Sequence, residues 1–266
     1  WVKRWIQEFS MPLGLHIVSW GHDPASEIYI RKKREAAQTL GITPTHTRAE
    51  SLSQAQKSIQ QANQNPKISG ILVQLPILQR SCTDVLLAEV APHKDVDGLH
   101  PYNQGSDQGI VPCTPWGAMI LAQQALGQES LKSKNVVIVG SSRLVGKPLA
   151  KEFIKNHATV VLTHVHTRNL PSWTRQADIL CTAAPTPHIL RAEDVNSAAI
   201  VIDIGISHLP SGKLAGNVDP YDLKCQAYTP VPGGVGPLTV LGLMVNTLKA
   251  AYQQKGRSLP QDFLGS

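Results

Sequence analysis

Tyr29 and Lys33 are the residues of this chain whose types and spacing best suit proton chemistry on a flat substrate. They belong to the run from 25 to 36 (ASEIYIRKKREA), which begins after a proline and continues to Gly41, so the pattern predicts a helix. Residues four apart project from one face of a helix, which places an aromatic ring beside an amine.

Arg31, Lys32 and Arg34 flank this lysine and crowd positive charge around it. Like charges favour the neutral form of a lysine, and a partly neutral amine can act as a general acid or base near neutral pH. Ser26 is interpreted as a helix-capping or substrate-positioning residue, because no histidine follows it at helical spacing to make it a nucleophile. An ordinary basic surface helix is the alternative, and these residues taken alone favour it.

The composition limits the class of protein. At 266 residues and 42% hydrophobic content, the chain suits two modest domains or one large α/β unit. No apolar run reaches the ~18 residues of a membrane span and no signal peptide opens the chain, so we expect no membrane partner and a cytoplasmic protein. The first residues resemble the middle of a helix, which suggests that an N-terminal element precedes them.

The cysteines and the net charge exclude further classes. The 4 cysteines form no CxxC pair, which indicates neither a metal site nor a disulfide framework. The charge of +6 comes from scattered residues, aromatic residues make up only 5% of the chain, and no nucleic-acid recognition motif is present. We therefore expect no nucleic-acid partner, and an anionic small molecule or cofactor explains the charge equally well.

The first half of the chain alternates strand-like and helical patterns, which predicts a parallel sheet covered by helices. Gln74 lies near the carboxyl end of a buried strand predicted over 69–76, where open α/β sheets bind ligands. The stretch 95–115 lacks periodicity and is long enough to indicate a functional loop. A helix from Thr114 to about Leu126 is expected to cross between domains.

The second half begins with a predicted strand over 135–140, followed directly by a glycine turn with Gly140 and Gly146 at its ends. A strand, glycine turn and helix in series place backbone N–H groups against a phosphate, although this spacing alone is weak evidence. Predicted strands at 158–163, 178–182 and 199–204 complete a Rossmann-like set.

A proline- and glycine-rich loop spans 229–237 (TPVPGGVGP) and precedes a final helix predicted over 238–252. Its composition indicates a rigid backbone that a ligand could approach closely. The alternative is a tight connector between domains.

Taken together, these stretches resemble the bifunctional methylenetetrahydrofolate dehydrogenase/methenyltetrahydrofolate cyclohydrolase family. The matching motifs, which occur in the family's order, are ASEIYIRKKREA, GILVQLPI, KDVDGLHPYNQG, PCTPWGAM, VGSSRLVGKPLA, VIDIGIS and TPVPGGVGPLTV. The resemblance implies an α/β protein of two domains with an active cleft between them. Residues 1–113 with 238–266 would form the folate-binding catalytic domain, and 114–237 the Rossmann-like NAD(P)-binding domain.

The resemblance also implies roles for single residues on tetrahydrofolate derivatives. Lys33 would be the catalytic acid/base, chiefly in the cyclohydrolase step, and Gln74 would hydrogen-bond it. Tyr29 would stack on the folate, and Asp97 would accept hydrogen bonds from the pterin, with Asp95 holding the loop. The folate would also contact Ser26, Pro232, Gly233 and Gly234, and the cofactor would contact Gly140, Ser141, Ser142, Val165 and Ile206. The family forms homodimers and uses NADP.

The sequence departs from the family's pattern on the cofactor side. Ser141 replaces an arginine that reads the ribose phosphate of NADP, and Val165 and His166 replace a serine and an arginine. Pro185 replaces a glycine and Asn217 an aspartate. Losing a phosphate-reading arginine could turn the preference from NADP toward NAD.

Three interpretations of these departures stay open. Arg143, Lys147 or Arg168 could replace the phosphate contact of the arginine that the family has at the position of Ser141. The chain could keep the cyclohydrolase step with a weak dehydrogenase. It could also be a folate-binding paralogue without catalysis. An intact set of folate-side residues favours the enzyme.

Overall fold

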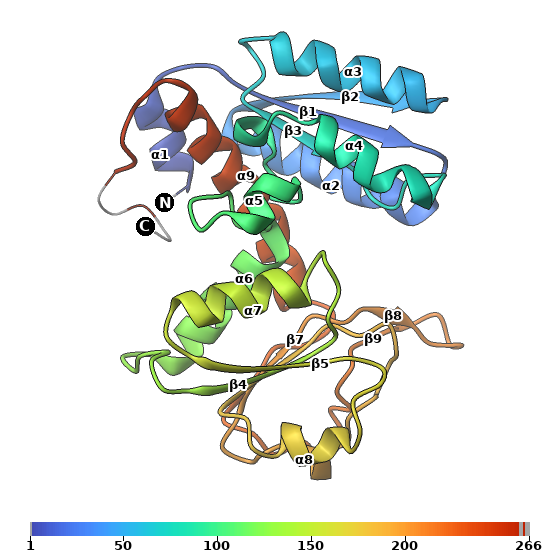
Figure 1. Ribbon diagram of the computed structural model, residues 1–266, viewed down its shortest axis with the longest axis vertical. Coiled ribbons are helices and arrows are strands. Elements are labelled where there is room, and N and C mark those ends of the chain that lie inside the picture. Colours follow the sequence, from blue (N-terminus) through green and yellow to red (C-terminus); the bar gives the residue numbers. More distant parts are fainter. Residues whose placement is uncertain (1, 261–262, 264–266) are drawn as a thin grey trace. The chain divides into compact units, whose positions relative to one another are not determined.

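The computed structural model describes residues 2–260 and 263, and the chain divides into two compact units (Figure 1). Unit 1 comprises Trp1–Cys113 and Val240–Ser266, and unit 2 comprises Thr114–Thr239. Helix α6 (Cys113–Leu126) begins at the first boundary, and helix α9 (Val235–Gln254) runs through the second. The final helix is therefore longer at both ends than the 238–252 expected from its sequence.

Unit 1 contains a parallel sheet in the order β2-β1-β3. Its strands are β1 (Leu13–Trp20), β2 (Ile42–Ala49) and β3 (Gly70–Val73). Parallel neighbours need crossover connections, and here α2 (Pro24–Leu40) and α3 (Leu52–Gln64) supply them. Strand β3 is shorter than predicted, so Gln74 follows its last residue directly.

Apolar side chains explain why these elements pack together. Val18 of β1 and Val73 of β3 lie in one buried cluster with Ile59 of α3 and Leu86 of α4 (Thr83–Glu89). Helix α1 (Val2–Phe9) packs against the last helix, because the Phe9 ring lies tilted against Tyr252 of α9 with ring centroids 4.7 Å apart. The remaining short helices of unit 1 are Arg80–Cys82, Pro92–Lys94 and α5 (Pro101–Gly105).

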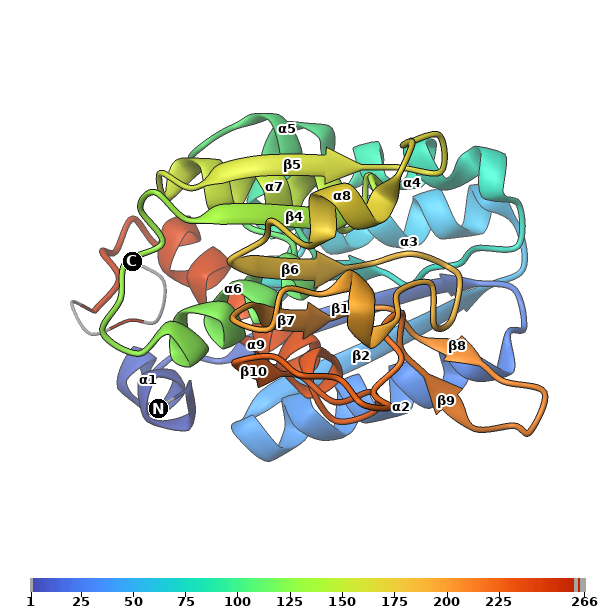
Figure 2. The ribbon, with the colours of Figure 1, turned by 90° about the horizontal axis from the view of Figure 1, so that it is seen from below.

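Unit 2 contains a five-stranded parallel sheet in the order β10-β7-β6-β4-β5 (Figure 2). Its strands are β4 (Asn135–Val139), β5 (Thr159–Thr163), β6 (Ile179–Thr182), β7 (Ile200–Asp203) and β10 (Ala227–Tyr228). Helices α7 (Gly146–Lys155) and α8 (Leu170–Thr174) follow β4 and β5. A short antiparallel pair, β8 (Ser207–His208) with β9 (Leu214–Ala215), and a 3-10 turn at Ala192–Asp194 complete the unit.

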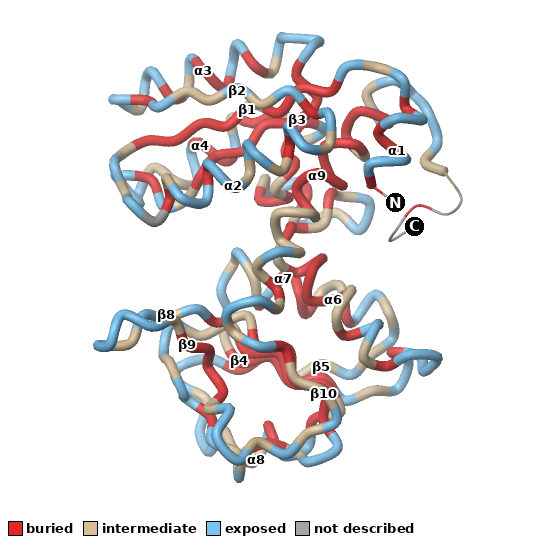
Figure 3. The backbone as a smooth tube through the Cα atoms, turned by 180° about the vertical axis from the view of Figure 1, so that it is seen from behind, coloured by how far each residue is buried: buried red, intermediate tan, exposed pale blue. Residues whose placement is uncertain are grey.

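Strand β4 is buried after its first residue, Asn135, and its backbone is coloured accordingly in Figure 3. Alternate residues of a strand point to opposite faces. Val136 and Ile138 pack with α6 and α7, whereas Val137 and Val139 pack with residues such as Leu190. This two-sided burial explains the uninterrupted apolar run that the sequence shows here.

Among residues 2–260 and 263, no helix combines the length and apolar character needed to cross a membrane.

Candidate active site

Lys33 on α2 is hydrogen-bonded to Gln74, the residue that follows the carboxyl end of β3. The Lys33 Nζ donates a hydrogen bond to the Gln74 Oε1 at 2.9 Å, and the Gln74 Nε2 donates to the Leu75 carbonyl at 2.6 Å. Because the amide nitrogen is held by the backbone, the amide oxygen faces the amine. Gln74 is only 7% exposed, so its orientation is fixed by burial as well as by hydrogen bonding.

Tyr29 lies one helical turn before Lys33 on α2 and is 41% exposed. The helix predicted from the sequence is confirmed over Pro24–Leu40. Lys33 is half-buried, whereas its basic neighbours Lys32 and Arg34 are exposed. The structure therefore separates this lysine from the rest of the basic run by its surroundings, and leaves an aromatic ring free to stack on a flat ligand.

Asp97 and Lys33 both lie within electrostatic reach of one buried thiol, that of Cys113. Burial raises the pKa of the Cys113 thiol well above its usual range; the charge of Asp97 raises this pKa further, and that of Lys33 opposes the rise. The thiol also donates to the Val96 carbonyl at 3.3 Å. The loop with Asp97 and the helix with Lys33 thus come together in unit 1. The sequence analysis gave Cys113 no role, because a lone cysteine carries no spacing signal.

The loop that carries Asp97 is anchored on both sides. The Asp95 Oδ2 accepts hydrogen bonds from the His100 N–H at 2.7 Å and the Asn103 Nδ2 at 2.9 Å. Burial raises the pKa of Asp95, and these two donors oppose that rise. The Lys94 Nζ caps the end of α3 by donating to three carbonyls, those of Ala62, Asn63 and Asn65. Asp95 therefore holds the loop, as expected, and Lys94 adds an anchor that the sequence analysis missed.

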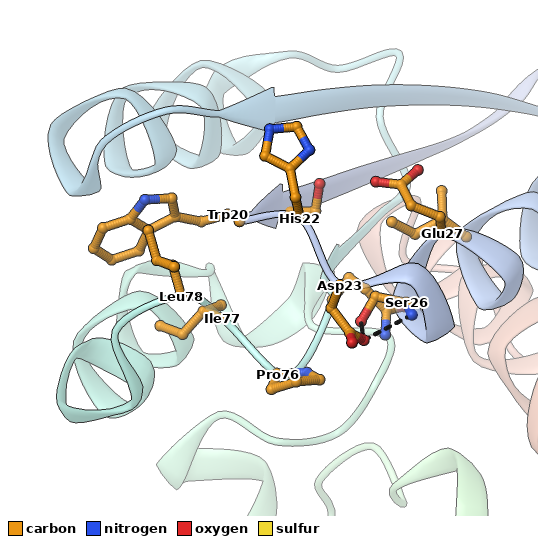
Figure 4. Close-up of a pocket in the computed structure, with 12 residues that line it drawn as sticks. Trp20, His22, Asp23, Ser26, Glu27, Pro76, Ile77 and Leu78 are labelled. Atoms are coloured by element: carbon orange, nitrogen blue, oxygen red, sulfur yellow. Dashed lines mark hydrogen bonds between the residues drawn. The ribbon is translucent and has the colours of Figure 1, made fainter.

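Ser26 contacts the carboxylate that caps α2. The Asp23 Oδ2 accepts from the Ser26 N–H at 2.8 Å and from its hydroxyl at 2.7 Å (Figure 4). The expectation that Ser26 itself caps the helix is wrong, because the acceptor is Asp23 at the N-cap position. Ser26 is the donor in both hydrogen bonds and belongs to the first turn of the helix.

A recess partly open to solvent lies beside this helix start. It is formed at the carboxyl ends of β1 and β3, where parallel sheets bind ligands, and it shares Gln74 with the Lys33 pair. Trp20, Ile77 and Leu78 form an apolar side, and Asp23 and Ser26 form a polar one (Figure 4).

The glycine turn after β4 fits a dinucleotide phosphate. Gly140 has φ +111°, and a side-chain carbon there would lie 2.4 Å from the Ala183 carbonyl oxygen. A carbon at Gly146 would lie 1.8 Å from the Gly140 carbonyl oxygen, so the turn closes only with glycine at both positions. The Ser142 hydroxyl accepts from the Val145 N–H at 3.1 Å, just before α7 begins. Strand, tight turn and helix N-terminus are the arrangement that binds phosphate.

The other predicted cofactor residues lie at neighbouring strand ends of unit 2. The Gly140 N–H donates to the Thr163 carbonyl at 3.1 Å, which places Ser141 beside the end of β5. Val165 follows β5 and is 89% exposed, and Ile206 follows β7 and is 46% exposed. Exposed apolar side chains at this edge of a parallel sheet suit contact with a ligand.

The proline- and glycine-rich loop belongs to unit 2 and leads into α9. Pro232 and Gly233 are exposed, and Gly233 has φ +115°. The Gly234 N–H donates to the Pro230 carbonyl at 2.8 Å, which closes a turn. An ordered turn with an exposed backbone agrees with the close approach predicted from its composition.

Within residues 2–260 and 263, histidine, cysteine and carboxylate side chains form no cluster of three or more that could hold a metal ion.

These features define a two-domain α/β protein, with an amine–amide pair on one sheet and a dinucleotide-binding turn on another. Two family models cover most of the chain: the tetrahydrofolate dehydrogenase/cyclohydrolase catalytic domain matches residues 2–97, and the NAD(P)-binding domain of the same family matches residues 112–255. The chain belongs to the tetrahydrofolate dehydrogenase/cyclohydrolase family.

Individual relatives agree with this assignment. The bifunctional protein FolD of Wolinella succinogenes is 44% identical over 247 residues, which cover 90% of this chain and 86% of the relative. The crystal structure of the FolD enzyme of Campylobacter jejuni matches with a TM-score of 0.89 at 36% identity, covering 95% of this chain and 93% of that one. The Trypanosoma brucei enzyme, solved with NADP and an inhibitor, matches with a TM-score of 0.86 at 29% identity, over 97% and 95%.

Proposed function

We propose that this chain oxidises 5,10-methylenetetrahydrofolate to 5,10-methenyltetrahydrofolate with NADP and then hydrolyses the product to 10-formyltetrahydrofolate. Membership of the family supports the pair of reactions. The observation that carries the hydrolytic step is the 2.9 Å hydrogen bond between Lys33 and Gln74. It holds an amine in a fixed place beside an exposed aromatic ring.

The folate-side residues would act as follows. Tyr29 stacks on the ring system, and Asp97 accepts hydrogen bonds from the pterin. Loss of hydride makes the one-carbon bridge a cation that water can attack without a metal or a nucleophilic serine. Lys33 takes a proton from the attacking water and returns it to the ring nitrogen as the carbon–nitrogen bond breaks, while the hydroxyl proton passes to solvent and leaves the formyl oxygen. The Gln74 oxygen keeps the amine aligned.

Further residues would contact the folate and the cofactor. Ser26, Pro232, Gly233 and Gly234 would contact the folate. The cofactor would be held at Gly140, Ser141, Ser142, Val165 and Ile206. When bound, the nicotinamide supplies the acceptor for the hydride. NADP is the first choice, and NAD is the alternative that the missing arginine at Ser141 favours.

Family membership also supports a homodimer working in the cytoplasm. Sedimentation of the purified chain would test the dimer.

The proposed function is tested by following the absorbance of methenyltetrahydrofolate in three reactions. We expect it to appear when methylenetetrahydrofolate is mixed with NADP and to decay when preformed methenyltetrahydrofolate is added alone. NAD in place of NADP measures the cofactor preference. Decay without appearance, with either cofactor, would instead support a cyclohydrolase that has lost the dehydrogenase step.

A further inference from the structure

Asn217 lies in unit 2 after strand β9 and is completely buried. Its side chain hydrogen-bonds with both its oxygen and its nitrogen. The Oδ1 accepts from the Ala184 N–H at 2.8 Å, and the Nδ2 donates to the Ala184 carbonyl at 2.9 Å and the Thr186 carbonyl at 2.7 Å. The amide therefore fits the backbone of residues 184–186 in one orientation only.

The segment held by Asn217 supports the glycine turn. The Ala183 N–H donates to the Val139 carbonyl at 2.7 Å, at the end of β4. A side-chain carbon at Gly140 would lie 2.4 Å from the Ala183 oxygen, so the turn and this segment are in direct contact. A shift of residues 183–186 would therefore move the backbone N–H groups of the glycine turn, which we propose to bind the cofactor phosphate.

The backbone of the same residue is tied to the strand that leads to Ile206. The Asp203 carboxylate accepts from the Asn217 N–H at 3.0 Å and the Val218 N–H at 2.9 Å. It also accepts from the Gly205 N–H at 3.2 Å, one residue before Ile206. Burial raises the pKa of Asp203, and these backbone donors oppose the rise.

Packing adds to these hydrogen bonds. A side-chain carbon at Gly205 would lie 2.1 Å from the Asn217 Oδ1, so the amide lies flat against this backbone. Asn217 thus contacts the segment after β6 and the loop after β7 directly, and it reaches the glycine turn through Ala183 of that segment.

We infer that Asn217 is a positioning residue for dinucleotide binding, which acts through the backbone of residues 183–186 and 203–206. This inference rests on the proposed cofactor-binding function. It also explains together two positions, 185 and 217, at which the sequence departs from the family's pattern. Pro185 and Asn217 belong to one contact, in which the segment offers two carbonyls and the amide supplies two matching donors.

An aspartate at position 217 could not make this contact. Its ionised carboxylate has no donor and would place negative charge against the carbonyls of Ala184 and Thr186. The amide is therefore the side chain that suits the proline-containing segment, and its presence is evidence of a maintained site rather than of a decayed one.

The test is Asn217→Asp, which keeps the size of the side chain and removes both donors. We expect the dissociation constants of NADPH and NADH, measured by their fluorescence without substrate, to rise about tenfold or more. Hydrolysis of preformed methenyltetrahydrofolate should keep its kcat. The lost affinity should partly return as the pH is lowered from 8 to 5.5, because a protonated carboxyl group regains one donor.

Asn196→Asp is the matched control. Asn196 also joins two backbone groups, since its Nδ2 donates to the Ala177 carbonyl at 3.2 Å and its Oδ1 accepts from the Ala198 N–H at 3.0 Å. Those residues precede β6 and β7, whereas the glycine turn follows β4. Asn196→Asp should therefore lower the melting temperature and leave both dissociation constants unchanged.

Asn217→Ser serves if the aspartate variant does not fold. Its short hydroxyl cannot span to both carbonyls, and we expect a smaller loss of affinity in the same direction. Folded variants at position 217 that bind NADPH like the wild type, or lose no more affinity than Asn196→Asp, would overturn the inference alone. A wild-type chain that binds neither dinucleotide would overturn the proposed dehydrogenase function together with it.

Discussion

Lys33 shows how one residue acquires a role that its neighbours lack. Arg31, Lys32 and Arg34 are exposed, as the surface-helix alternative predicts. Lys33 is half-buried, with its amine on the oxygen of Gln74. The difference comes from the contact between Lys33 on α2 and Gln74 directly after β3, and residue types alone do not predict that contact.

Ser141 is the residue at which cofactor preference can be changed most simply. In Ser141→Arg, a guanidinium would lie at the turn where a ribose phosphate is expected, and a hydrogen bond to a charged group contributes about 1.5–3 kcal/mol. We predict that the variant binds NADPH about tenfold or more tightly and NADH nearly unchanged, measured by fluorescence titration. Ser141→Met adds similar bulk without charge and is the control. Equal tightening of both cofactors would show that this position does not read the phosphate.

At the scale of elements, two half-buried histidines join strands β1 and β2 to each other, and one of them also reaches helix α3. His16 on β1 bonds Thr45 of β2 and Ser58 of α3, each at 2.8 Å. His46 on β2 bonds the Ser19 hydroxyl at 2.9 Å. Burial lowers the pKa of both rings below the ordinary value of 6.5. The charge of His46 lowers the pKa of His16 further, whereas for His46 the attraction of Glu27 opposes the shift.

These lowered pKa values give stability a definite dependence on pH. Between the folded pKa values and 6.5, the unfolded chain binds more protons than the folded one. The free energy of unfolding should therefore fall as the pH drops through 6.5 toward the folded values. We predict that the double variant His16→Gln, His46→Gln flattens this slope, measured by urea unfolding from pH 8 to 5. The exposed His208→Gln is the control, and an unchanged slope in the double variant would refute the assignment.

The elements themselves were largely predictable. Apolar runs and helical patterns in the sequence predicted strands β1, β3 and β4 and helices α2 and α3 to within a few residues. The two-residue strands β8, β9 and β10 were missed, because so short a strand leaves no period in the sequence. Contacts between distant residues were also missed: the Lys33–Gln74 bond joins positions 41 apart, and Thr182 meets Asp203 across 21.

At the scale of the whole molecule, the assignment of the last helix, α9, to the catalytic domain came from the family resemblance and not from the residues alone. The helix begins in unit 2 and ends in unit 1. Asn246 on its buried side donates to the Val96 carbonyl at 3.0 Å and the Val111 carbonyl at 2.9 Å, beside Asp97. The last helix thus supports the loop that carries Asp97. Its apolar pattern predicts a helix but cannot say which sheet it joins.

The Lys33–Gln74 pair and the glycine turn lie in different units, so the two reactions should be separable by mutation. Residues of the Lys33 pair lie in unit 1, and the glycine turn with Asn217 lies in unit 2. A change to Lys33 should stop hydrolysis and leave cofactor affinity intact. A change at Asn217 should weaken cofactor binding and leave hydrolysis intact.

The most direct test is the hydrolysis of preformed methenyltetrahydrofolate by Lys33→Met, with Lys32→Met as the matched control on the same helix. Methionine keeps the length of the side chain and removes the amine. We predict that Lys33→Met loses hydrolysis by about a hundredfold or more, while folate binding and the NADPH dissociation constant stay at wild-type values and Lys32→Met behaves as wild type. Hydrolysis by Lys33→Met at the wild-type rate would contradict the role given to this lysine.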